Sequence, residues 1–151
     1  MIQLLRSFTS LGFIGKLPGA PGTYGSIATL PIAFLWAGLV NENHVLTLGL
    51  IIILAILGTM ASAIVARSLE DEDPSEIVID EVVGQWIAVL ALPFHWGYWL
   101  AAFVLFRIFD IWKPSIINKS QELPGGLGIM MDDILAGLLA FLLVQGAAAI
   151  L

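Results

Sequence analysis

The chain contains no cysteine and carries little charge. The absence of cysteine from its 151 residues excludes disulfide bonds, thiolate metal sites and a cysteine nucleophile. Charged residues make up 12% of the chain, whereas soluble domains have roughly 25%. The six lysines and arginines are scattered and form no stripe, which argues against a nucleic-acid surface. No cleavable signal peptide is predicted, because lysine and arginine break the short N-terminal apolar stretch.

Apolar residues make up 59% of the chain, and the mean hydropathy of the whole chain is +0.97. Five segments are apolar all round rather than along one stripe, which favours membrane spans over a water-soluble bundle. These segments are residues 26–40, 45–66, 77–94, 97–112 and 129–151. The third and fourth have 18 and 16 residues, so a tilted or re-entrant arrangement also fits them. The sequence therefore predicts one domain over residues 1–151, an all-α compact helical bundle of about five main membrane-spanning helices.

The basic residues predict how this bundle is oriented. With five spans of alternating direction, all six fall on one side: Arg6, Lys16, Arg67, Arg107, Lys113 and Lys119. The opposite connections, residues 41–44 and 95–96, carry neither lysine nor arginine, and they place His44 and His95 on that other side. The positive-inside rule makes the basic side cytoplasmic and the C-terminus external.

Five acidic residues lie about one helical turn inside these apolar segments: Asp80, Glu81, Asp110, Asp132 and Asp133. The hairpin formed by segments 77–94 and 97–112 brings the first three to one level, and the last segment begins from the same side. An unpaired charge in hydrocarbon costs several kcal/mol, so such a cluster indicates a functional site at one end of the bundle. Ligands that are all oxygen select a hard cation, for which Mg²⁺ is the leading candidate.

Two basic residues accompany the acids. Arg107, Asp110 and Lys113 recur at i, i+3 and i+6, so neighbours meet on the helix surface, where Arg107 suits bidentate contact with phosphate and Lys113 a point contact. Simpler interpretations remain open: Arg107 with Asp110 as a structural ion pair, Asp132 as a helix N-cap, and Asp133 as a first-turn acid.

Residues 15–26 are rich in glycine and proline and lead into a helix for which Ser26 is the expected N-cap. Exposed N–H groups at such a helix start can bind an anion, although the segment is not a P-loop and also fits a simple connection. The acidic run Glu70, Asp71, Glu72, Asp73 and Glu76 is expected to be solvated.

Four ordered blocks resemble the phosphatidylglycerophosphatase A family: Pro21-Gly-Thr-Tyr-Gly-Ser26, Ile79-Asp-Glu-Val-Val-Gly84, Phe106-Arg-Ile-Phe-Asp-Ile-Trp-Lys-Pro114 and Gly125-Gly-Leu-Gly-Ile-Met-Met-Asp-Asp133. The resemblance spans nearly the whole chain. It implies a Mg²⁺-dependent bacterial membrane phosphatase that converts phosphatidylglycerophosphate to phosphatidylglycerol. It also implies that the five acids, together with Thr23, Ser26, Arg107 and Lys113, occupy the family's motif positions.

The predicted function is accordingly a phosphomonoesterase of the bacterial cytoplasmic membrane whose site faces the cytoplasm. Its partners would be the phospholipid substrate and the bilayer, and its chemistry would use either an activated water or an aspartyl nucleophile. A cation transporter or channel is the main rival, but the far halves of the five segments are apolar, which favours a one-sided site. A CDP-alcohol phosphotransferase, the rival enzyme, should show Asp-Gly and Ala-Arg elements that this chain lacks.

Overall fold

The computed structural model describes residues 1–150. Within them the chain forms seven α-helices and one short 3₁₀-helix, η1, and no strand, which confirms the all-α prediction. In chain order the elements are α1 (Ile2–Thr9), η1 (Ile14–Lys16), α2 (Pro21–Leu39), α3 (His44–Leu69), α4 (Ile79–Val89), α5 (Trp96–Trp112), α6 (Ser115–Ser120) and α7 (Gly126–Ala148). The final predicted helix extended to residue 151, which lies outside the described residues.

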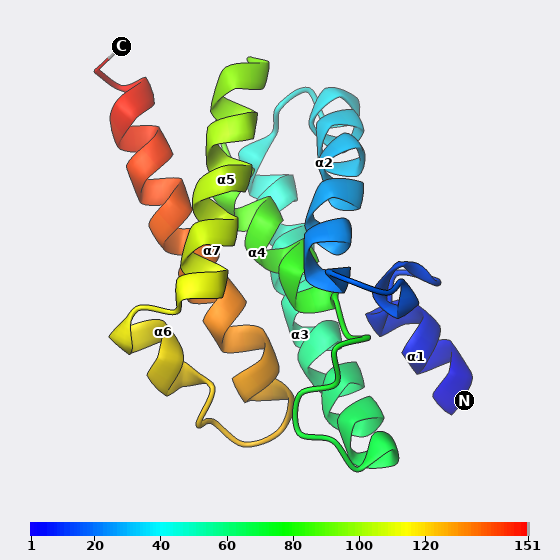
Figure 1. Cartoon of the computed structure of the whole chain (residues 1–151). Coiled ribbons are helices and arrows are strands. Elements are labelled where there is room, and N and C mark those ends of the chain that lie inside the picture. The colour runs from blue at the N-terminus through cyan, green and yellow to red at the C-terminus, as the bar shows by residue number, and fades with distance from the viewer. Residues whose placement is uncertain (151) are drawn as a thin grey trace.

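Helix α4 forms the centre of the bundle. It packs against α2, α3, α5 and α7, and Figure 1 shows these longer helices around it. Every residue of α4 except Glu81 is buried. Helix α4 is therefore a core element of the bundle, with protein on all of its sides.

The predicted third segment, residues 77–94, is longer than the helix that forms. Helix α4 has 11 residues, about 16 Å at 1.5 Å per residue, which is too short to cross a hydrocarbon core of about 30 Å. After Val89 the chain turns through Ala91, whose φ of 55° ends the helix, before Pro93. Gln145 on α7 donates to the carbonyls of Leu90 and Ala91, at 3.0 and 2.9 Å, and so satisfies groups that a longer helix would have paired.

Among residues 1–150, α3 and α7 are long and apolar enough to cross a membrane. The five-span prediction therefore holds by length and composition for two segments and is wrong for α4. The reason is that a helix buried on all sides by protein has the same continuous apolar sequence as one surrounded by lipid.

Small residues bring α7 close to its neighbours. A Cβ added at Gly137 would collide with the carbonyl of Gly84 on α4, and one added at Gly126 would collide with the carbonyl of Thr59 on α3. Close approach of backbones through glycine is common where helices cross. The α4–α7 crossing at Gly84 and Gly137 lies about one turn from Glu81 and Asp133, so it sets the distance between the acids of the two helices.

Candidate active site

All five acids line one cavity of about 280 Å³, at the level where α2 and α4 begin and α5 ends (Figure 1). The first turn of α4 contributes Asp80 and Glu81, and α5 contributes Asp110 in its last two turns. Helix α7 begins at Gly126, three residues earlier than predicted, so Asp132 and Asp133 lie in its second turn. Asp132 is therefore not an N-cap and Asp133 is not a first-turn acid, and both simpler interpretations are wrong.

The carboxylates form two groups that share one member. Ligand oxygens of Asp80, Glu81 and Asp133 lie within 4.8 Å of one another, as do those of Asp110, Asp132 and Asp133. Asp133 is the member that the two groups share, and its side chain is buried, at 2% exposed. The structure confirms the prediction that three helices bring their acids together.

Several carboxylate oxygens in this cluster have no protein partner. Within residues 1–150, Asp80 Oδ1, Glu81 Oε2 and Asp133 Oδ2 are buried and accept no hydrogen bond. Burying a carboxylate without a partner costs several kcal/mol, and crowding several together adds their mutual repulsion. A bound cation would remove both costs, and an oxygen-only donor set fits a hard divalent ion. The residues present therefore fit a metal site of the predicted kind.

Arg107 lies beside the acids on α5. Its Nη1 is 2.6 Å from Asp110 Oδ2 and 4.0 Å from Glu81 Oε1, and it donates to Ser26 Oγ at 3.4 Å. Its Nε is buried and has no partner among residues 1–150. Arg107 therefore makes the ion pair that the structural interpretation requires, and it also lines the cavity.

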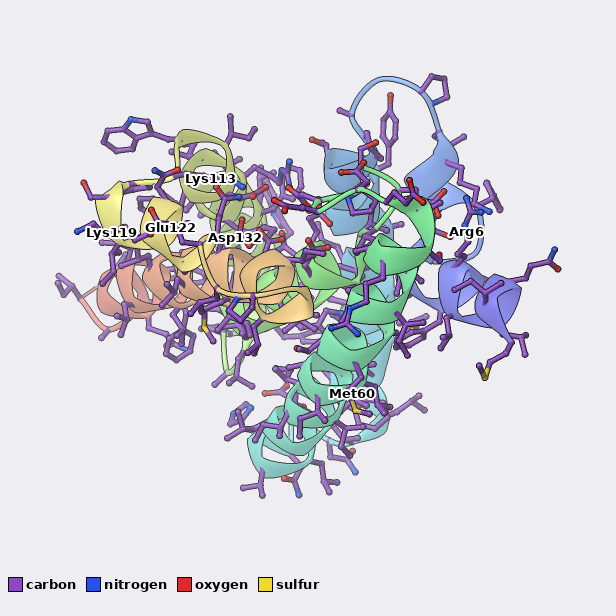
Figure 2. All side chains as sticks on the ribbon, turned by 90° about the horizontal axis from the view of Figure 1, so that it is seen from below. Arg6, Met60, Lys113, Lys119, Glu122 and Asp132 are labelled. Atoms are coloured by element: carbon purple, nitrogen blue, oxygen red, sulfur yellow. The ribbon has the colours of Figure 1, made fainter. Side chains whose placement is uncertain are left out.

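Lys113 reaches the cavity because α5 ends there. Lys113 takes the left-handed conformation at the end of the helix, with φ of 47°, and Pro114 follows. Its Nζ donates to Asp132 Oδ2 at 2.7 Å, and Figure 2 shows the two residues side by side at this end of the molecule. Gln121 Nε2 donates to the same oxygen at 2.9 Å. Gln121 was not predictable from the sequence, because a single amide in a polar loop carries no signal.

The glycine-rich segment lies against the acids, with a different helix start from the one predicted. Helix α2 begins at Pro21, not after Ser26, so the N-cap prediction for Ser26 is wrong. Ser26 is fully buried one turn inside the helix, where its Oγ donates to the carbonyl of Gly22 at 2.9 Å. Gly22 and Thr23 line the cavity, whereas Ser26 lies behind Arg107.

Gly22 is a second residue of the site whose role the sequence did not predict. A Cβ at this position would collide with Glu81 Oε1 and would lie 3.4 Å from Arg107 Nη1. The absence of a side chain therefore lets the start of α2 approach the carboxylates. The first turn of a helix also has N–H groups without an intrahelical partner, so Gly22 and Thr23 present donors to the cavity.

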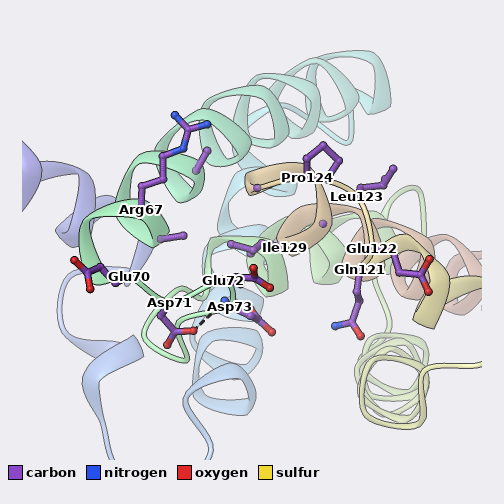
Figure 3. A pocket seen from close by; sticks show the side chains of 14 residues that line it. Arg67, Glu70, Asp71, Glu72, Asp73, Gln121, Glu122, Leu123, Pro124 and Ile129 are labelled. Carbon is purple, nitrogen blue, oxygen red and sulfur yellow. Dashed lines mark hydrogen bonds between the residues drawn. The ribbon is translucent and has the colours of Figure 1, made fainter.

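The segment between α3 and α4 separates this cavity from a second one of about 660 Å³, which Figure 3 shows. Glu70, Asp71, Glu72 and Asp73 are exposed there, which confirms the prediction that they are solvated. Glu76 differs from them, because it accepts hydrogen bonds from Arg6 Nε and Nη2 at 2.7 and 2.8 Å. These hydrogen bonds hold the pKa of Glu76 below its ordinary value and tie α1 to the segment that leads into α4.

The fold and the cavity define a small all-helical protein with an acidic site, bordered by arginine and lysine, at one end of its bundle. Residues 7–148 match the family model for phosphatidylglycerophosphatase A. The chain belongs to the phosphatidylglycerophosphatase A family, which confirms the family and the phosphatase class predicted from the four sequence blocks.

Three curated relatives are similar over most of their length. The chain is 42% identical to a Bacteroides thetaiotaomicron protein named "Putative phosphatidylinositol-3-phosphatase", over 88% of this chain and 86% of the relative. It is 39% identical to phosphatidylglycerophosphatase A of Escherichia coli, over 83% and 73%. It is 37% identical to phosphatidylglycerophosphatase A of Haemophilus influenzae, over 86% and 80%. No solved structure matches the chain.

Proposed function

We propose that this protein hydrolyses phosphatidylglycerophosphate to phosphatidylglycerol and phosphate in the bacterial cytoplasmic membrane, with its cavity facing the cytoplasm. The observation that carries the proposal is the meeting of Arg107, Lys113 and five carboxylates in one cavity of about 280 Å³. The two relatives named phosphatidylglycerophosphatase A support this choice of substrate.

The phosphate would be held by basic groups and backbone donors from two helices. Arg107 brings a guanidinium with a buried, unpaired Nε, and Lys113 brings an ammonium from the end of the same helix. The N–H groups of Gly22 and Thr23 and the hydroxyl of Thr23 would contact the phosphate from α2. Donors arranged in advance around a developing negative charge stabilise the transition state without reorganising.

Mg²⁺ would be held by a subset of Asp80, Glu81, Asp110, Asp132 and Asp133. The unpaired buried oxygens of Asp80, Glu81 and Asp133 support this assignment. When bound, such an ion polarises phosphoryl oxygens and lowers the pKa of a bound water. Lys113 and Gln121 both donate to Asp132 and would keep its carboxylate oriented.

The chain's own groups then define the proton transfers. Asp80 Oδ1, which has no partner among residues 1–150, would accept a proton from the attacking water and return it to the phosphatidylglycerol oxygen that leaves the phosphorus. Burial of the cluster limits access of bulk water, which strengthens the attraction between the phosphate and Arg107. An aspartyl nucleophile from the same cluster is the alternative first step, with water attacking in the second.

Membrane insertion is supported by the surface of α3. Four of its outward apolar side chains are at least half exposed: Ile52, Ile53, Ile56 and Met60. An exposed apolar surface of this kind is typical of contact with a membrane or another protein. Helix α7 is the second helix of sufficient length and hydropathy. With these helices in the bilayer, the acyl chains of a lipid would stay in hydrocarbon while the phosphate reaches the acids.

Phosphate release by the purified full-length protein tests the proposal. We expect release from phosphatidylglycerophosphate in mixed micelles with Mg²⁺, and much less from glycerol 3-phosphate, which lacks acyl chains. Phosphatidylinositol 3-phosphate is the second lipid to assay, because the Bacteroides relative carries that name. A clear preference for it would overturn the substrate assignment, and no release from either lipid would overturn the phosphatase proposal.

A further inference from the structure

An open apolar groove of about 710 Å³ runs along α5 beside the catalytic cavity. Val104, Ile108, Ile111 and Trp112 form most of its surface, with Thr23 of α2 and Arg107 at one side. Apart from Thr23 and Arg107, every residue that lines it is apolar. The groove therefore suits a hydrocarbon ligand and not a polar one.

The groove and the catalytic cavity share two residues. Thr23 and Arg107 line both, so the groove opens beside the groups proposed to hold the phosphate. The guanidinium of Arg107 belongs to the acidic site, since its Nη1 contacts Asp110, and Thr23 lies beside it in the first turn of α2. A molecule that fills both spaces must be polar at one end and apolar along the rest.

The apolar side chains of the groove continue as a stripe along α5. Val104, Ile108 and Trp112 recur every four residues, and Leu100 extends the row by one more turn away from the site. Val104 is 44% exposed, Ile108 46% and Trp112 73%, so no other helix in the described part of the chain covers them. From Leu100 to Trp112 the stripe is about 18 Å long, close to the roughly 15 Å depth of hydrocarbon in one leaflet.

We infer that this groove and stripe bind an acyl chain of the lipid substrate, which reaches the cavity sideways from the bilayer, past Thr23 and Arg107. The choice of an acyl chain as occupant rests on the proposed lipid phosphatase function. Trp112 lies at the phosphate end of the stripe, and tryptophan is enriched at the depth of lipid headgroups. The inference makes α5 the element that recognises the lipid tail, whereas α2, α4 and α7 complete the phosphate site.

Filling the groove tests this inference. Ile108→Trp adds bulk without adding charge, and Ile56→Trp on the outward face of α3 is the matched control, since Ile56 is 56% exposed and lies outside the groove. We expect Ile108→Trp to lower kcat/KM for dioleoyl phosphatidylglycerophosphate by about tenfold, the loss of binding to a few methylene groups. Hydrolysis of the dibutyryl analogue, whose chains are too short to follow the stripe, should be unchanged. Equal losses on both substrates, or no loss on either, would overturn the inference.

A second measurement, on the wild-type protein and the same two variants, needs no turnover. A phosphatidylglycerophosphate analogue with a photoreactive group in its acyl chain is bound in the presence of EDTA and cross-linked. Labelling of the peptide that carries residues 103–112, lost in Ile108→Trp and kept in Ile56→Trp, supports the groove. Labelling that is the same in both variants overturns it.

The two proposals fail in different ways. Absence of phosphate release from every lipid contradicts the phosphatase function, while the cross-link still decides whether the groove binds a chain. The remaining alternative is that a second copy of the protein covers the stripe. Ile111→Cys, introduced into this cysteine-free chain, would then form a disulfide-linked dimer in membranes, and that result would overturn the inference.

Discussion

Arg107 occupies a position where an ion pair and a phosphate contact compete for the same side chain. It is 2.6 Å from Asp110, and its neighbours Ser26 and Glu81 hold it from the other helices. A structural arginine and a phosphate-binding arginine therefore look alike in the free protein. The two roles differ in what happens when the guanidinium is replaced by an ammonium.

Arg107→Lys keeps the charge and loses the planar fork of donors. If Arg107 binds the phosphate more tightly in the transition state, kcat and kcat/KM should fall together, by roughly 100-fold, the range for loss of one stabilising donor. Steady-state kinetics and thermal melting on one preparation separate the roles. A lower Tm with an unchanged kcat would show that Arg107 serves only the fold.

Gly22 gives a second test at the scale of one residue. Gly22→Ala places a methyl group against Glu81 Oε1, the flexible end of a side chain, so Glu81 should move while the fold survives. Misplacing a catalytic group by an ångström is costly, and we expect kcat/KM to fall at least about tenfold.

Gly38→Ala on the same helix is the control for Gly22→Ala, because no atom lies within 4 Å of the added Cβ. It should leave the kinetics unchanged. Normal activity in Gly22→Ala would contradict the close approach of α2 to the carboxylates.

The residues of the site were predictable where charge stands out from its surroundings. Five acids, Arg107 and Lys113 lie in or beside apolar segments, so each was visible in the sequence, and the hairpin argument placed them on one level. Gln121 and Gly22 were not predictable, because their roles depend on which loop and which helix start come close in space. Ser26 was misread as an N-cap, since Pro21 begins α2 one turn earlier.

At the scale of helices, the α4–α7 crossing positions the acids. Gly137→Ala would press a methyl group onto the carbonyl of Gly84, a backbone atom that cannot rotate away. Overpacking of this kind costs about 1–3 kcal/mol in the free energy of unfolding. We expect a lower Tm together with reduced activity, as α7 carries Asp132 and Asp133.

Gly146→Ala near the end of α7 is the matched variant, since no atom of residues 1–150 lies within 4 Å of its Cβ. It should leave Tm unchanged or raise it, because alanine is favoured over glycine in a helix by up to about 1 kcal/mol. Equal Tm values for Gly137→Ala and Gly146→Ala would show that the crossing tolerates extra bulk.

Most main helices were predictable from continuous apolar sequence, and their ends were not. The segments at 45–66 and 97–112 became α3 and α5 with small changes at their ends. The segment at 77–94 became the much shorter α4, because hydropathy does not distinguish burial in protein from burial in lipid. The short helices α1 and α6 were missed, since six to eight residues carry too weak a periodic pattern.

For the whole molecule, the distribution of lysine and arginine predicts that the end with the carboxylate cavity faces the cytoplasm. His44, at the start of α3, and Glu122, after α6, are exposed and lie on opposite sides in this arrangement. His44→Cys and Glu122→Cys can each be labelled without background in a cysteine-free chain. In intact cells an impermeant thiol reagent should label His44→Cys, and should reach Glu122→Cys only after lysis. Labelling of both variants before lysis would refute the predicted topology.

We propose that the buried carboxylate cluster is the catalytic site of a metal-dependent lipid phosphatase. A titration of phosphatidylglycerophosphate hydrolysis with Mg²⁺ tests this claim, for the wild-type protein, Asp80→Asn and Glu72→Gln. Glu72 is the matched acid, exposed and outside the cavity. We predict no activity of the wild type in EDTA, recovery with Mg²⁺, a loss of roughly 100-fold or more in Asp80→Asn, and normal behaviour of Glu72→Gln. Full activity in excess EDTA, or equal activity in Asp80→Asn and Glu72→Gln, would contradict the claim.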